Sequence, residues 1–202
     1  PAGSHDHPAK LGPVATELRL RDGTHAIAWS LLPGDREALR EIYETLSPET
    51  QFHRFLAPVP HLTEAMLDHL VDEVDGVDHV ARVMFVLEDG VDGEVGVPAG
   101  VARMIRNSED PTAADVAVTE VDKYQGRGVA TALLDELMRH RPKGIERLVT
   151  EVAADNPASL AMLRRLGPTT IERDGINMLK VVVDLPPAPE APEPPAGPTE
   201  TS

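Results

Sequence analysis

The segment from Tyr124 to His140 constrains the fold and function of this chain more than any other. It opens with a glycine-rich turn and continues as an amphipathic helix, whose buried face would consist of Ala130, Leu133, Leu134 and Leu137. A turn of this kind directs several backbone N–H groups to one point, and the helix dipole favours negative charge there. No acidic residue lies between Lys123 and Leu134. The segment therefore predicts a binding site for a phosphate group.

The spacing around the two glycines excludes two common phosphate motifs. The dinucleotide fingerprint needs a third small residue where this chain has Thr131, and the acid about twenty residues on, Glu146, falls in no matching unit. The Walker motif needs a Lys-Ser/Thr pair after its second glycine, and this chain has none. Residues 125–130 instead match Gln/Arg-x-x-Gly-x-Gly/Ala, and so resemble the pyrophosphate loop of the GNAT superfamily of N-acetyltransferases.

A second segment strengthens this resemblance. Residues 156–167, from Asn156 to Gly167, are similar to the family's Asn-x-x-Ala/Ser-x-x-x-Tyr-x-x-x-Gly motif. In the family this motif follows a strand and lies along the pantetheine arm of coenzyme A. Here it follows the apolar run 148–152, which predicts a strand. The two motifs occur in the expected order, and the resemblance covers residues 25–184.

The resemblance implies a mixed α/β (α+β) domain over residues 15–185, with a central mixed twisted sheet of six to seven strands and four or five flanking helices. The local patterns agree with that order. They predict an early strand within 17–30 with a turn at Asp22-Gly23, helices beginning after Gly34-Asp35, Ser47 and Thr63, and strands at 80–87, 96–105 and 115–121. A closing hairpin is predicted at 169–173 and 178–183. The irregular order argues against a Rossmann domain.

Both ends of the chain are predicted to be disordered. Residues 1–14 are short, polar and contain glycine and proline, and residues 186–202 contain seven prolines. Such segments bury too little apolar surface to become ordered. The proline-rich segment is expected to be a tail, or a linker to a further domain.

Composition narrows the classes of partner. The net charge is −15, which argues against nucleic-acid binding and would attract a cationic acceptor, although acidic residues often form only a solvated surface. The chain has no cysteine, and its eight histidines form no helical metal pair with an acid, so no metal site is expected. No apolar run reaches membrane-spanning length and no leader is evident, so we expect a cytoplasmic monomer or weak homodimer without a membrane partner.

The resemblance implies acetyl-CoA as the co-substrate. In the family the backbone at the end of one strand binds pantetheine, and the matching residues here are Val118, Thr119 and Glu120. The backbone N–H groups that would hold the pyrophosphate belong to Gln125, Gly126, Arg127, Gly128, Val129 and Ala130. Asn156 and Ser159 would contact the cofactor from the second motif. Asn156 is also a good helix N-cap before Pro157, a role worth about 1 kcal/mol and compatible with cofactor binding.

For catalysis the resemblance implies direct attack of an amine on the thioester, assisted by a carboxylate base. The candidates are Asp115, where the family often has glutamate, together with Glu120 and Glu151, which lie in apolar strands. The family's tyrosine acid corresponds to Leu163, which cannot donate a proton. Two hypotheses follow: an N-acetyltransferase for a primary amine, or a catalytically weak CoA-binding regulatory module.

The acceptor is the least constrained part of the prediction. Residues 46–55 resemble the corresponding helices of bacterial protein-lysine acetyltransferases, which modify metabolic enzymes such as acyl-CoA synthetases and in some cases are fused to a larger partner. The resemblance therefore implies a lysine-bearing metabolic enzyme as the acceptor. A small amine such as a polyamine or an aminoglycoside remains the alternative. Phe52 and Phe55 in this segment fit equally well as core residues.

Overall fold

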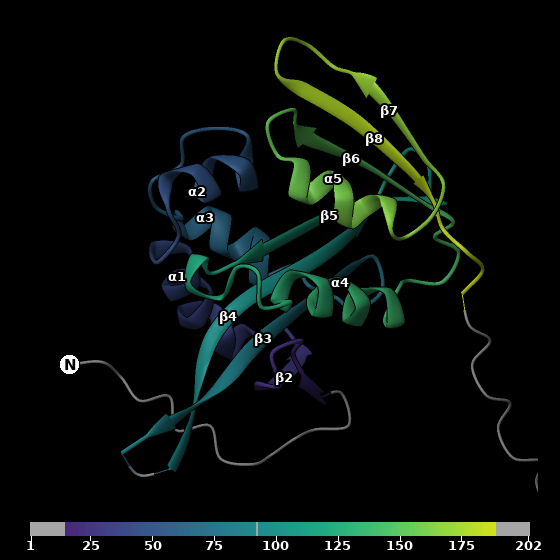
Figure 1. The fold of residues 1–202 in the computed structure, drawn as a ribbon. Helices are drawn as coiled ribbons and strands as arrows, with labels where there is room; N and C mark the ends of the chain where they lie inside the picture. The colour runs from purple at the N-terminus through teal and green to yellow at the C-terminus, as the bar shows by residue number, and fades with distance from the viewer. Residues whose placement is uncertain (1–14, 92, 189–202) are drawn as a thin grey trace, which may run out of the picture.

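In a computed structural model of the protein, residues 15–91 and 93–188 are described, and they form one mixed sheet with helices on both faces (Figure 1). The sheet has eight strands in the order β1-β2-β3-β4-β5-β6-β8-β7. The strands are β1 (Thr16–Arg19), β2 (His25–Ser30), β3 (His79–Gly90), β4 (Gly93–Arg106), β5 (Ala113–Glu120), β6 (Arg147–Ala153), β7 (Thr169–Arg173) and β8 (Met178–Asp184). All neighbours are antiparallel except β5 and β6.

Five α-helices lie within the described residues: α1 (Arg36–Glu44), α2 (Pro48–Phe55), α3 (Glu64–Leu67), α4 (Val129–Arg139) and α5 (Pro157–Arg164). Short turns of other helix types precede α1 (η1, Pro33–Asp35), follow α3 (η2, Asp68–Asp72) and follow β5 (η3, Asp122–Tyr124). The predicted caps are present, because the side chains of Ser47 and Thr63 accept hydrogen bonds from the N–H groups of Thr50 and Met66. None of these helices is long and apolar enough to span a membrane.

The predicted α/β class and mixed sheet are confirmed, but the strand count of six to seven was too low. The segment predicted as an early strand with a turn at Asp22-Gly23 is the hairpin β1–β2, in which the chain reverses at Gly23. This glycine has a φ of +85°, and its N–H donates to the Leu20 carbonyl at 2.9 Å. The predictions for residues 1–14 and for most of 186–202 fall outside the described residues.

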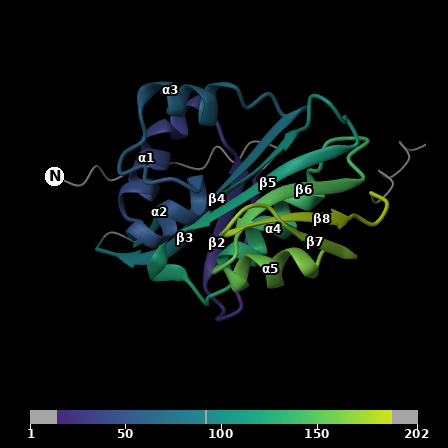
Figure 2. The same cartoon turned by 90° about the horizontal axis from the view of Figure 1, so that it is seen from above.

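Helices α1, α2 and α3 cover one face of the sheet, and α4 and α5 cover the other (Figures 1 and 2). Alternation along β4 sets these two faces. Arg103 reaches the carbonyl of Leu70 on the α3 side, whereas a Cβ added at Gly100 would meet Leu133 of α4. With few aromatic residues, the core is built from aliphatic side chains, and β3 is buried from His79 through Val86.

A buried ion pair joins the sheet to α4. The Nη2 of Arg82 on β3 lies 2.9 Å from the Oε2 of Glu136 on α4, and both side chains are fully buried. Arg82 also donates to the carbonyl of Ala28 and to the hydroxyl of Ser30. This network fixes α4, and therefore the glycine-rich turn before it, against the centre of the sheet.

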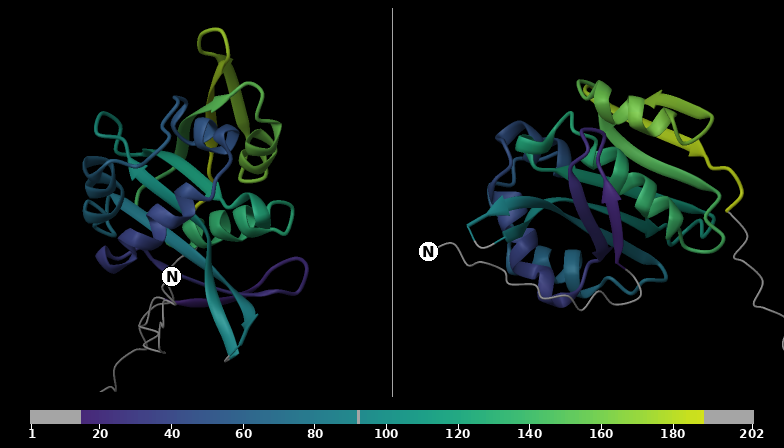
Figure 3. Two further views of the ribbon diagram at one scale, coloured as in Figure 1. Left: turned by 90° about the vertical axis from the view of Figure 1, so that its left-hand side faces the viewer. Right: turned by 60° about the horizontal axis from the view of Figure 1, so that its bottom comes forward.

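The ladder between β5 and β6 is much shorter than its neighbours. These parallel strands pair only at Ala113↔Arg147 and Ala114↔Leu148, whereas β4 and β5 pair along the whole of β5. Beyond Ala114 the two strands separate. In Figure 3, strands β7 and β8 lie at one end of the molecule, and the β3–β4 hairpin extends to the opposite end.

Candidate active site

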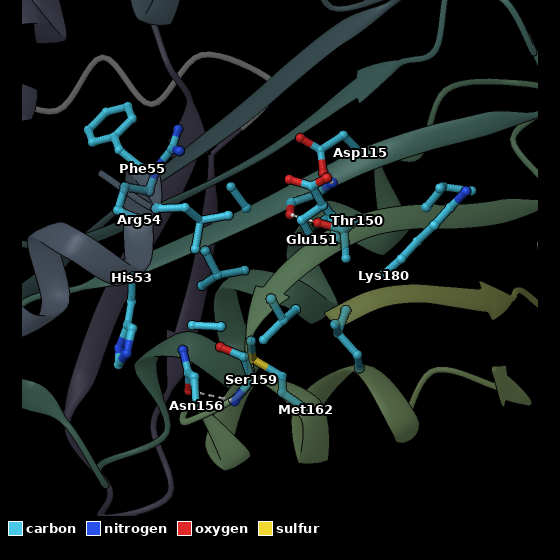
Figure 4. A pocket seen from close by; sticks show the side chains of 18 of the residues that line it. His53, Arg54, Phe55, Asp115, Thr150, Glu151, Asn156, Ser159, Met162 and Lys180 are labelled. Carbon is cyan, nitrogen blue, oxygen red and sulfur yellow. Dashed lines mark hydrogen bonds between the residues drawn. The ribbon is translucent and has the colours of Figure 1, made fainter. Parts of the chain in front are cut away.

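A cavity of about 490 Å³ occupies the place where β5 and β6 separate. Strands β5 and β6 form its walls, α2 closes one side and α5 the other (Figure 4). Asp174 and Lys180, from the β7–β8 hairpin, complete the lining. Leu134 of α4 also lines the cavity, so the short β5–β6 ladder leaves a site that residues of β5, β6, α2, α4, α5 and the β7–β8 hairpin reach.

The backbone of β5 presents alternate residues to this gap. Directly after β5, the N–H of Val121 donates to the Ala99 carbonyl of β4. The backbone N–H and C=O groups of the odd-numbered residues of β5 therefore point to β4, and those of the even-numbered residues point to β6. Val116 fits this alternation, since its carbonyl accepts a 3.2 Å hydrogen bond from the Oγ1 of Thr150 on β6. Val118, the next even residue, lines the cavity. Of the three predicted pantetheine contacts, Val118 and Glu120 direct backbone groups into the gap, whereas Thr119 directs its groups to β4.

The glycine-rich turn has the conformation that its glycines permit. Gly126 and Gly128 have φ values of +77° and +95°, and a Cβ added at Gly126 would meet nothing within 4 Å. Two amides are used inside the turn, since Gln125 N–H donates to Asp122 O at 3.1 Å and Arg127 N–H to Tyr124 O at 3.2 Å.

The other N–H groups predicted to bind phosphate differ in whether they already have an acceptor. The N–H of Ala130 donates to the Oε2 of Glu120 at 3.1 Å. Those of Gly126, Gly128 and Val129 have no acceptor among residues 15–91 and 93–188. Three amides at the start of α4 are therefore available to an anion.

The cationic side chains of the turn are engaged elsewhere. The guanidinium of Arg127 donates to Asp22 Oδ2 and to Thr24 Oγ1, both at 2.6 Å, and so is held against the β1–β2 turn. Lys123 Nζ donates to Glu88 Oε1 at 2.8 Å. The turn therefore offers phosphate its backbone amides rather than these two cations.

Helix α5 brings the second motif to the cavity. Asn156 Oδ1 accepts a 3.1 Å hydrogen bond from the N–H of Ser159, as expected of an N-cap, and both residues line the cavity. Leu163 also lines it and is buried. The position of the family's tyrosine therefore faces the site, with a side chain that has no proton to give.

The structure separates the three candidate carboxylates. Asp115 and Glu151 line the cavity from β5 and β6 and lie close together in Figure 4. The Oδ1 of Asp115 accepts the N–H of Val116 at 2.9 Å, which holds this carboxylate at the gap. Glu120 instead points to the start of α4, where burial raises the pKa of its carboxyl above the usual range.

Helix α2 supplies residues that sequence reasoning did not select. His53, Arg54 and Phe55 line the cavity opposite Asp115 (Figure 4), and His53 Nε2 lies 3.2 Å from Asp155 Oδ1 before α5. Phe55 packs against Tyr43 with ring centroids 5.6 Å apart, whereas Phe52 is 41% exposed. Of the two phenylalanines, Phe55 is therefore packed and Phe52 is exposed.

Asp122 is a second residue that sequence reasoning missed. It accepts hydrogen bonds from the backbone N–H of Ser47 at 2.7 Å, from Thr50 Oγ1 at 2.8 Å and from Gln125 Nε2 at 2.9 Å. It thus ties the start of α2 to the glycine-rich turn. Its only sequence signal was an acid directly after a strand, and its partners on α2, Ser47 and Thr50, lie more than seventy residues earlier.

Within the part of the chain that the structure describes, no three histidine or acidic side chains are grouped so that they could hold a metal ion.

A mixed sheet that splits at one parallel strand pair, beside a glycine-rich helix start, is the architecture that the sequence resemblance implies for an acetyltransferase. The model of the acetyltransferase (GNAT) family matches residues 37–167, and this chain belongs to that family.

Two curated relatives agree with this assignment. Acetyltransferase Pat of Mycolicibacterium smegmatis is 32% identical over 176 residues, which are 87% of this chain and 50% of that protein. Acetyltransferase PA5475 of Pseudomonas aeruginosa is 34% identical over 149 residues, which are 73% of this chain and 77% of that protein. The chain thus spans only about half the length of the first of these relatives.

Solved structures show the same relationship. The GNAT domain of S. lividans PAT superimposes with a TM-score of 0.70 at 28% identity, covering 85% of this chain and 97% of that one. The cAMP-binding acyltransferase from Mycobacterium smegmatis gives 0.56 at 29% identity, covering 90% of this chain and 50% of that one. The resemblance to Pat-type acetyltransferases drawn from the sequence is confirmed at the level of the family.

Proposed function

We propose that this domain transfers the acetyl group of acetyl-CoA to a primary amine, and that the amine is a lysine side chain of a protein. One observation carries the proposal. Val118 and the carboxylate of Asp115 line the gap, and β5 leads from it to the glycine-rich turn, where the N–H groups of Gly126, Gly128 and Val129 have no acceptor among the described residues. An extended substrate with an anionic end and a reactive end fits such a site.

The residues present fit acetyl-CoA. The amides of Gly126, Gly128 and Val129 would hold the pyrophosphate, and the open space at Gly126 lets phosphate oxygens approach the backbone. The backbone of Val118 would pair with the pantetheine arm as an added strand does, while Asn156 and Ser159 border it from α5. Acetyl-CoA supplies an acyl group that its thioester already activates.

The protein's part in the reaction is to orient the amine and accept its proton. Asp115 is the proposed base, acting directly or through one water, and Glu151 is the nearby second carboxylate. The amine nitrogen forms the new C–N bond as the C–S bond breaks, and the thiolate takes up a proton. Since Leu163 cannot supply that proton, it comes from water or from the ammonium formed on attack.

Three observations support a protein lysine as the acceptor. The net charge of −15 attracts cationic surfaces. The chain is similar to relatives named Pat, and α2, which falls in residues 46–55, borders the cavity; in the superfamily that the chain resembles, these helices border the acceptor site. A lysine-bearing metabolic enzyme remains the proposed partner.

The test is release of the CoA thiol from acetyl-CoA in the presence of lysine-bearing proteins, polyamines, aminoglycosides and small amines. We expect turnover with proteins, and a loss of about a hundredfold or more in kcat for Asp115→Asn with the acetyl-CoA affinity unchanged. Glu151→Gln is compared in parallel. The matched control is Glu17→Gln, which makes the same chemical change on the exposed strand β1.

The competing function is that of a CoA-binding regulatory module, because Leu163 stands where the family has a proton-donating tyrosine. If acetyl-CoA binds but no amine in the panel is acetylated, that function replaces the transferase. Saturable turnover that Asp115→Asn abolishes excludes it.

A further inference from the structure

Arg54 is a cation in the cavity wall without a hydrogen-bonding partner. It stands in the last turn of α2 and is half-buried, and the Cζ of its guanidinium lies 4.5 Å from the centre of the Phe55 ring. Among residues 15–91 and 93–188, no oxygen accepts a hydrogen bond from its guanidinium. A guanidinium has five N–H donors, and a buried charge without an acceptor is costly. The missing acceptor points to a group that arrives with the substrate.

A second arginine increases the positive charge on this side of the cavity. Arg103 on β4 is 3% exposed, and its Nη1 donates to the Leu70 carbonyl at 2.9 Å and lies 3.1 Å from His79 Nε2. Burial, and then the neighbouring Arg54, lower the pKa of Arg103 to about 9, so it is still charged at neutral pH. Two cations therefore stand close together on the α2 side.

Among residues 15–91 and 93–188, no acid near the cavity forms an ion pair with Arg54. Asp115 attracts the guanidinium electrostatically but makes no hydrogen bond to it, and the Oδ1 of Asp115 accepts the N–H of Val116. Lys180, the other basic residue that lines the cavity with a permanent charge, lies opposite Glu151 in one ladder and Glu172 in the next. The two permanent cations of the lining thus lie on different sides of the cavity, Lys180 on the β8 side and Arg54 on the α2 side.

We propose that Arg54 binds a carboxylate of the acceptor, so that the preferred acceptors carry an acid close to the reactive amine. The amine would face Asp115 and the acid would face α2 across the cavity (Figure 4). This inference rests on the proposed transferase function. Two sources share the required chemistry: a free amino acid, or a lysine with a neighbouring aspartate or glutamate in a protein.

The test uses pairs of acceptors that differ only in a carboxylate. One pair is lysine and lysine amide. The other is a capped peptide with glutamate beside lysine and the same peptide with glutamine. In the native domain we expect kcat/KM to be about ten to a hundred times higher for the acid member of one pair, since that is the effect of one charge-assisted hydrogen bond. The pair that shows the ratio identifies the source.

Arg54→Gln should reduce this ratio to about one, mainly through KM of the acid member. Arg54→Lys should keep part of the ratio, because an ammonium cannot make the forked pair. Arg19→Gln, the same change on exposed β1, should keep the native ratio. Thermal melts establish that each variant is folded, and if Arg54→Gln does not fold, the fall of the ratio in Arg54→Lys is the test.

The possible failures are distinct. Turnover with equal rates for both members of each pair, or a native ratio in the Arg54 variants, overturns the carboxylate site and leaves the transferase function intact. If acetyl-CoA binds and no member of either pair is acetylated, while the wider amine panel is also silent, the transferase function itself fails.

Discussion

The carboxylate of Glu120 accepts a 3.1 Å hydrogen bond from the N–H of Ala130, in the first turn of α4. This amide is one of those that the sequence predicts for the pyrophosphate of acetyl-CoA. A carboxylate and a phosphate therefore compete for the same end of the helix. Burial raises the pKa of Glu120, so its charge is lost at a higher pH than that of an ordinary glutamate.

We predict that Glu120→Gln binds acetyl-CoA more tightly at neutral pH, by about three- to tenfold, because one like charge is removed next to the phosphates. In the native protein the affinity should rise as pH falls through the raised pKa of Glu120, and the variant should lack this rise. Calorimetric titration between pH 5 and 8 measures both, and the difference between the two proteins removes the titration of CoA itself. Unchanged affinity in the variant would show that Glu120 is not a competitor.

Gly126→Ala should lose acetyl-CoA binding without losing more stability than a matched variant. Gly126 and Gly76 have φ values of +77° and +73°, and an added Cβ meets nothing within 4 Å at either position. Each alanine should therefore cost about 1–2 kcal/mol of folding free energy. Only the first places a methyl group where phosphate oxygens approach. Equal affinities in the two variants, measured by titration, would contradict a phosphate site at this turn.

Asp122→Asn should release the start of α2. Burial alone would raise the pKa of Asp122, but hydrogen bonds from Ser47 and Thr50 outweigh this effect and hold the pKa below its usual value. This group therefore stabilises the fold above the pKa of an unfolded aspartate, and the contribution is lost as pH falls through the lower folded pKa. Hydrogen exchange of the α2 amides should be faster in the variant and the acceptor KM higher.

The control for this prediction is Asp155→Asn, which alters a single exposed contact to His53. Exchange in α2 that is equally fast in both variants would mean that Asp122 does not anchor the helix.

Glu136→Gln should be the most destabilising of these changes, by about 3 kcal/mol, because it leaves Arg82 charged and buried. Arg139→Gln, which removes an exposed partner of the same carboxylate, should cost less than about 1 kcal/mol. Denaturant unfolding compares the two. Similar losses in both variants would contradict the importance of burial.

The carboxylate of Glu136 should also make the free energy of unfolding depend on pH. Burial alone would raise the pKa of Glu136, but hydrogen bonds from Thr16 and the charge of Arg82 outweigh it and lower the pKa. Its stabilisation is therefore present above the ordinary glutamate pKa and is lost as pH falls through the folded value. The native protein should lose stability in acid more steeply than Glu136→Gln.

Local chemistry made much of the fold predictable. Ser47 before Pro48, Thr63 and Asn156 are caps whose side chains bond to amides a few residues away, so short segments determine them. Gly126 and Gly128 encode their own turn through positive φ. The hairpin β1–β2 was underestimated because its two strands are short, and only its turn was evident in the sequence.

The candidate site was predictable only where it lies along one stretch of chain. Asp115 and Glu151 line the cavity as proposed from their strands, although their roles remain predictions. Glu120 was predicted both as a base and as a pantetheine contact, but its side chain points to the start of α4. Arg54 could not be selected from the sequence. Its importance depends on its guanidinium having no hydrogen-bond acceptor among the described residues, and this is evident only once α2 is packed across the sheet.

The short β5–β6 ladder also has a consequence for how the domain is held together. Strands β6, β8 and β7 form a continuous three-stranded ladder of their own, and α5 lies within the same stretch of chain. Two residue pairs join this unit to the rest of the sheet. The C-terminal quarter is therefore held to the rest of the domain mainly by side-chain packing, since Leu148 and Val181 belong to the same core as β3 and α4, and only to a small extent by strand pairing.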